Sequence, residues 1–157
     1  MPVRQQIAII ATTLLLSFNS YAATEVVVEN AWVRTAPPSA RVLAAYMDIT
    51  NHSGQPRYLI SASSPQFKSV ELHQTSMNDG MMHMTPVDAV TLEKGKTIHI
   101  EPGGYHFMLM GPRQRIHRGD KITLKLGFKN GETVAVEAEV KDSRDESGQT
   151  ASHQHHH

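Results

Sequence analysis

Apolar and polar residues alternate with a period of two along most of the chain, and no segment has a convincing run of helical spacing. The clearest case is residues 121–140. Every second residue is apolar from Ile122 to Phe128, and the alternation resumes at Val134 after the turn-favouring pair Asn130-Gly131. Because successive side chains of a strand point to opposite faces, this segment predicts a hairpin with one apolar face.

Similar alternation predicts further short strands separated by Pro, Gly and Asn-rich turns. The expected ranges are 25–34, 42–50, 57–62, 69–74, 81–86, 97–101 and 106–110. Many short strands at this spacing are typical of an all-β fold, either a two-sheet β-sandwich or a closed barrel, of which we prefer the sandwich. We expect one domain over residues 23–141, followed by a disordered and flexible tail, 142–157, that has almost no apolar side chain to bury.

The N-terminus has the pattern of a secretory signal peptide. Arg4 precedes a mostly apolar run, and small residues at positions 20 and 22 suit a signal peptidase. We therefore expect cleavage after Ala22 and export to the periplasm. A membrane anchor is the alternative, but the run is shorter than the roughly 20 apolar residues that a spanning helix needs. A lipoprotein is not expected, since there is no cysteine to acylate.

Charge and composition exclude several function classes. Removing residues 1–22 takes away Arg4 and no acid, so 14 basic residues face 15 acidic ones, a formal charge of −1 that gives no support for nucleic-acid binding. The absence of cysteine excludes a disulfide framework, a thiolate metal site and a blue-copper electron carrier. No nucleophile–base–acid motif is recognisable, so we do not expect an enzyme.

Methionine is concentrated in one part of the chain. Six of the eight methionines lie between Thr75 and Gly111, some of them beside the turn 78–80, where gap-filling in a core is not expected. Strand parity turns His73 outward together with Glu71, because Val70 and Leu72 face the core. Parity also puts Met82 and Met84 on one face and His83 on the other.

The segment HFMLMG, residues 106–111, alternates in the same way. His106, Met108 and Met110 share one face, while Phe107 and Leu109 share the other. Taken alone, the segment fits a core strand. Together with His73 and Met84 it gives two imidazoles and two thioethers, a donor set that favours Cu(I).

The spacing of these four residues resembles that of a known family, the periplasmic copper chaperones of the PCuAC type. Their pattern is His, ten residues, Met, twenty-one residues, then His-x-Met, and His73, Met84, His106 and Met108 match it. The resemblance extends over residues 25–140. It implies a cupredoxin-like β-sandwich that binds Cu(I) through these four side chains and delivers it toward the binuclear copper centre of cytochrome c oxidase. The implied partner is an oxidase subunit or another copper chaperone.

Other methionines and histidines have weaker candidate roles. Met77, Met82 and Met110 are candidates for shielding the metal. The tail histidines His153, His155, His156 and His157 are a candidate second site that captures Cu(II), unless they belong to an expression tag. The alternative function for the same four main ligands is periplasmic copper storage or resistance.

Overall fold

The computed structural model describes residues 25–142, and all regular structure in this range is β-strand. The strands are β1 (Val26–Arg34), β2 (Val42–Asn51), β3 (Arg57–Ser63), β4 (Phe67–Asn78), β5 (Met81–Pro86), β6 (Val90–Leu92), β7 (Thr97–Ile100), β8 (Tyr105–Pro112), β9 (Lys121–Phe128) and β10 (Thr133–Lys141). The predicted all-β class is confirmed. The expected signal peptide and tail histidines lie outside the described residues.

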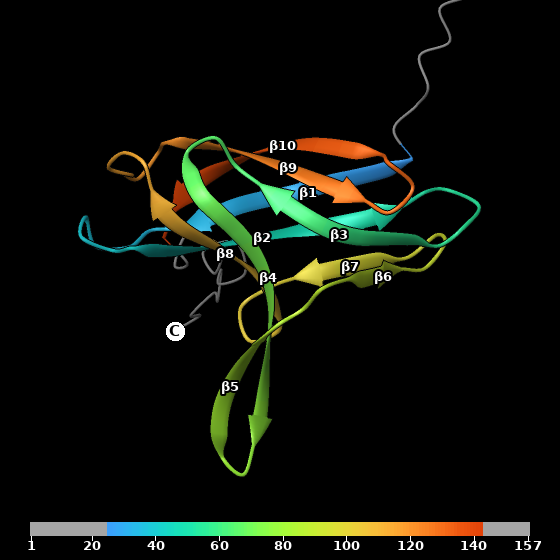
Figure 1. Cartoon of the computed structure of the whole chain (residues 1–157), viewed down its shortest axis with the longest axis horizontal. Helices are drawn as coiled ribbons and strands as arrows, with labels where there is room; N and C mark the ends of the chain where they lie inside the picture. Colours follow the sequence, from blue (N-terminus) through green and yellow to red (C-terminus); the bar gives the residue numbers. More distant parts are fainter. Residues whose placement is uncertain (1–24, 143–157) are drawn as a thin grey trace, which may run out of the picture.

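The strands form a flattened sandwich whose two layers are joined by hydrogen bonds (Figure 1). Neighbouring strands follow the order β5-β4-β8-β7-β2-β1-β10-β9-β3-β6, and β8 also pairs with β2. A further pairing, between Ala62 of β3 and Val70 of β4, joins two strands that stand near opposite ends of this order. The sheet of the expected sandwich is therefore closed at β4, as in a barrel.

The predicted alternation produces the core. Ile122, Leu124 and Leu126 of β9 are fully buried, and the apolar residues of the neighbouring strand β10 lie beside them on the same face of the sheet. The connection between these strands is longer than the pair Asn130-Gly131 suggests. It spans residues 129–132, and Gly131 alone supplies the positive φ (87°) that the turn requires.

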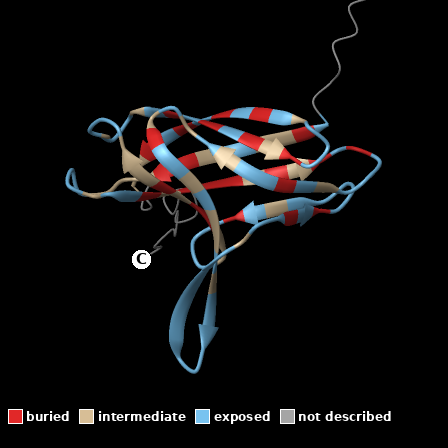
Figure 2. Ribbon diagram, in the orientation of Figure 1, coloured by how far each residue is buried: buried red, intermediate tan, exposed pale blue. Residues whose placement is uncertain are grey.

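The β4–β5 hairpin extends beyond the sandwich (Figure 1). Sequence alternation predicts that β4 ends at Gln74, but the strand continues to Asn78, because its outer half pairs with β5 and not with the core. All six residues of β5 are exposed, so most of the hairpin is surrounded by solvent (Figure 2). The short strand β6 was not expected, since three residues are too few to display a period.

Strand β8 separates its side chains as parity predicts. Phe107 and Leu109 are 1% and 0% exposed and belong to the core cluster. His106 and Met108 lie on the opposite face, beside β4 and β2. Within residues 25–142, no helix is long and apolar enough to span a bilayer.

Candidate metal centre

Two histidines lie side by side at the base of the hairpin. His73 of β4 and His106 of β8 are directly opposite in the antiparallel register. Their ring centroids are 5.9 Å apart and the ring planes are inclined by 37°. His106 is buried, at 6% exposure, and only 12% of the His73 side chain is exposed. Sequence parity predicts that both side chains lie on the face opposite the core residues of their strands, and the register of β4 against β8 places them next to each other.

Each imidazole has one nitrogen in a hydrogen bond and one without. Nε2 of His73 lies 3.0 Å from Oε2 of Glu71, and Nδ1 of His106 lies 3.3 Å from the carbonyl oxygen of Gly104. A carboxylate and a carbonyl accept hydrogen bonds, so these ring nitrogens carry the protons. The lone pairs then belong to Nδ1 of His73 and Nε2 of His106. Both of these atoms are buried, and neither has a hydrogen-bond partner among the described residues.

This combination has a specific chemical meaning. Buried polar atoms are nearly always paired, so two neighbouring imidazole lone pairs without a donor are unusual. A histidine that binds a metal typically donates its other N–H to a carboxylate or backbone carbonyl, which fixes the tautomer and the ring orientation. Glu71 and Gly104 supply one acceptor of each kind. The Gly104 carbonyl is itself held in place by the backbone N–H of Thr75, at 3.0 Å.

The two thioethers occupy the positions around His73 on the same face. Met108 is opposite Glu71 and Met84 is opposite Thr75, so each is a diagonal neighbour of His73. Diagonal neighbours in a sheet are about 7–8 Å apart, within reach of long side chains. His73 on the central strand β4 is therefore flanked by His106 and Met108 from β8 and by Met84 from β5.

A surface cavity of about 350 Å³ opens beside these residues. Its walls include Met84, His106 and Met108, together with Met82 and the loop residues Pro102 and Gly103. His73 is not part of the wall and lies opposite His106 on the neighbouring strand β4. Met84 is 56% exposed, whereas His106 is buried, so the candidate ligands extend from the solvent to the base of the hairpin.

A cation also borders the cavity. Arg34 lines it, and its guanidinium carbon lies 5.4 Å from the ring centroid of Tyr46 and 6.0 Å from that of Trp32. Its Nε is buried and has no hydrogen-bond partner within the part of the chain that the structure describes. Burial raises the pKa of the Tyr46 hydroxyl, and the charge of Arg34 partly opposes this shift.

The sequence does not identify Arg34, Tyr46 or Gly104 as neighbours of the site. They come from β1, β2 and the loop before β8, and no spacing along the chain links them to the His-Met pattern. Glu71 was detectable, since parity puts it on the face of His73.

Harder metal ligands do not form a centre of their own in the part of the chain that the structure describes. Within residues 25–142, no three His, Asp or Glu side chains are grouped in a way that could hold a metal ion.

The remaining candidates have different surroundings. Met82 lines the cavity, Met77 is opposite Met82 on the hairpin, and Met110 is half-buried next to Val42 without lining the cavity. His83 points away from this face, as parity predicts, because it pairs with Ser76.

Sequence relatives were found across the described domain. The family model LpqE-like, described as "Putative lipoprotein LpqE-like", matches residues 26–140. "Putative lipoprotein Lxx21020" of Leifsonia xyli subsp. xyli is 34% identical over 73% of this chain and 69% of its own length. "Uncharacterized protein RP573" of Rickettsia prowazekii is 28% identical over 62% of this chain and 54% of its own length.

Solved structures of PCuAC domains share the fold. The copper-bound PCuAC domain from PmoF2 has a TM-score of 0.64 at 24% identity, covering 78% of this chain and 97% of that domain. The apo form of DR1885 from Deinococcus radiodurans has a TM-score of 0.60 at 34% identity, covering 91% of this chain and 95% of DR1885. Its Cu(I) form has a TM-score of 0.57, also at 34% identity, covering 79% and 83%. The chain thus belongs to the LpqE-like family and has the all-β fold of the PCuAC domains.

Proposed function

We propose that this chain is an exported Cu(I)-binding metallochaperone whose ligands are His73, Met84, His106 and Met108. The observation that carries the proposal is the pair of buried imidazole nitrogens without hydrogen-bond partners, on adjacent rings whose other nitrogens donate to Glu71 and to a backbone carbonyl. This arrangement is typical of metal-binding histidines. The relation to DR1885, a structure of which contains Cu(I), also supports it.

The donor set suits Cu(I) better than other metals. Thioether sulfur is a soft ligand that selects Cu(I), and imidazole also binds copper well. All four ligands are neutral, so the charge of the ion is not compensated by a thiolate. An acceptor with cysteine thiolates would bind the ion more tightly, and transfer would proceed down a gradient of affinity.

The position of each ligand suggests an order of transfer. Met84 lies on the exposed hairpin and would be displaced first by an incoming acceptor ligand. Met108 and His106 line the same cavity at greater depth, so they would hold the ion until the acceptor has engaged it. The proposed destination is the binuclear copper centre of cytochrome c oxidase, through an oxidase subunit or another copper chaperone. The signal-like N-terminus supports export to the periplasm.

Competition against a chromophoric Cu(I) chelator tests the binding site. Met84→Ala and His106→Ala should each weaken Cu(I) binding, because each removes one ligand. His83→Ala is the matched control, since His83 is adjacent to Met84 but lies on the other face of β5 and should leave affinity unchanged. Unchanged affinity in both ligand variants would refute the site.

A deletion strain tests the direction of copper flow. Loss of oxidase activity that added copper restores supports delivery. Copper sensitivity with normal oxidase activity instead supports storage or resistance, the alternative role for the same ligands.

A further inference from the structure

The outer half of the β4–β5 hairpin carries exposed methionines that the four-ligand site does not use. Met77, Met81 and Met82 are 64%, 63% and 62% exposed. Methionine normally fills gaps in cores, as Met47 does here at 2% exposure. The hairpin has no core to fill, because it projects into solvent (Figure 2). These thioethers therefore contribute little to the stability of the fold.

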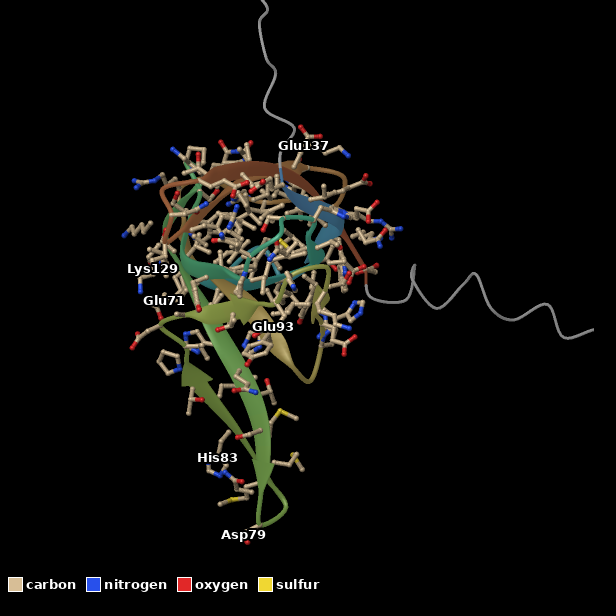
Figure 3. The ribbon with its side chains drawn as sticks, turned by 90° about the vertical axis from the view of Figure 1, so that its right-hand side faces the viewer. Glu71, Asp79, His83, Glu93, Lys129 and Glu137 are labelled. Carbon is tan, nitrogen blue, oxygen red and sulfur yellow. The ribbon has the colours of Figure 1, made fainter. Side chains whose placement is uncertain are left out.

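The turn aligns two of these side chains. Asp79 lies at the tip of the hairpin (Figure 3), and Asp79 and Gly80 connect the paired residues Asn78 and Met81. Their φ values are 52° and 75°, so both central residues are left-handed as in a type I′ turn. A two-residue turn of this kind fixes the register, and Met77 lies directly opposite Met82. Directly opposite residues have Cβ atoms about 4.5–5.5 Å apart on the same face. Two flexible thioethers at that separation can bind one ion.

Met77 and Met82 lie on the same face of the hairpin as Met84, a ligand of the proposed main site. Met84 is two residues beyond Met82 and therefore points to the same side of β5. Met82 and Met84 both line the cavity that contains His106 and Met108. Met81 has almost the same exposure but pairs with Asn78 on the opposite face. Thioethers thus form an unbroken row from near the tip of the hairpin to the cavity.

We propose that Met77 and Met82 form a second, weaker Cu(I) site that captures the ion and passes it to the main site through Met84. Two thioethers select a soft monovalent ion but hold it less tightly than four ligands, so the ion moves inward. The Asp79 carboxylate at the tip adds a negative charge that attracts the cation. Each step exchanges one neutral ligand for another, thioether for thioether along the hairpin and thioether for imidazole at the main site, and the oxidation state of copper does not change. This inference rests on the proposed function only for the destination of the ion.

Methionine methyl NMR with Ag(I), a soft monovalent ion that does not change oxidation state in air, tests the proposal on the full chain. The first equivalent of Ag(I) should shift the methyl signals of Met84 and Met108. Further Ag(I) should shift the signals of Met77 and Met82 together, while that of Met81 stays in place. Binding by histidines elsewhere in the chain does not interfere, because each methyl signal reports on its own thioether.

A double variant, Met77→Leu with Met82→Leu, tests whether the pair loads the main site. Loading from a weak Cu(I) donor, followed by stopped flow, should be several-fold slower than in the wild type, and the equilibrium affinity, measured separately, distinguishes slower loading from weaker binding. Met81→Leu is the matched control and should load at the wild-type rate.

The outcomes separate the two proposals. Static Met77 and Met82 signals, or an unchanged loading rate in the double variant, overturn the hairpin site and leave the main site intact. Shifts of Met77 and Met82 without shifts of Met84 and Met108 support the hairpin site and overturn the main one.

Discussion

Glu71 should tune the affinity of the main site without touching the metal. Its carboxylate accepts a hydrogen bond from Nε2 of His73, which leaves Nδ1 as the proposed ligand atom. Glu71→Ala removes this acceptor and its negative charge. A metal about 2 Å from Nδ1 would be about 7 Å from the carboxylate oxygen, a separation at which two unit charges interact by about 0.6 kcal/mol in water and about 2.4 kcal/mol at an effective dielectric constant of 20.

The expected effect lies between these limits because the Glu71 side chain is 48% exposed and partly screened by solvent. We expect Cu(I) affinity to fall about tenfold, at the lower end of the 10–100-fold range typical of residues that orient metal-binding histidines. Glu71→Gln keeps a carbonyl acceptor and should recover part of the loss.

Chelator competition at fixed pH and ionic strength measures this effect. Glu93→Ala is the charge-matched control, because Glu93 is exposed in the turn between β6 and β7 and is not among the residues that line the cavity. If Glu71→Ala binds Cu(I) as tightly as the wild type while His73→Ala binds more weakly, the assignment of Nδ1 as the ligand atom is wrong.

Three further predictions concern stability and charge. Phe107→Ala should lower the free energy of unfolding by about 3–5 kcal/mol in urea titrations. Val42→Ala, at a 40% exposed position, should lower it by less than about 1 kcal/mol. Equal losses would contradict the assignment of Phe107 to the core. The pKa of His99 is raised by its hydrogen bond to Asp48 and by the charge of that carboxylate. A raised folded-state pKa contributes stability that is complete below the ordinary pKa of 6.5 and is lost as the pH rises through the folded-state pKa. His99→Gln should therefore lower the free energy of unfolding near pH 5.5 but not near pH 9. An equal loss at both pH values would refute this coupling. Arg34→Gln removes a positive charge from the cavity wall and should tighten Cu(I) binding several-fold, with a larger gain for Cu(II), as measured by competition titrations; weaker binding would indicate that Arg34 acts by shaping the cavity.

The strand pattern was predictable because burial imposes a period of two wherever a strand has one face in the core. β9, β10 and the faces of β8 follow this rule, and their residues were assigned correctly from sequence. The outer half of β4 was missed for the same reason. Its residues beyond Gln74 are paired with β5 in solvent, where no core enforces alternation.

By itself, the sequence determined which side chains share a face: His73 with Glu71, Met84 with Met82, and His106 with Met108. It also excluded thiolate chemistry through the absence of cysteine. Only the tertiary structure decided which strands are neighbours. The pairing of β4 with both β8 and β5 brings the histidines to a ring separation of 5.9 Å and sets Met84 beside them. Parity is a local property of one strand, whereas register, ring tautomers and the position of Arg34 depend on contacts between segments far apart in the chain.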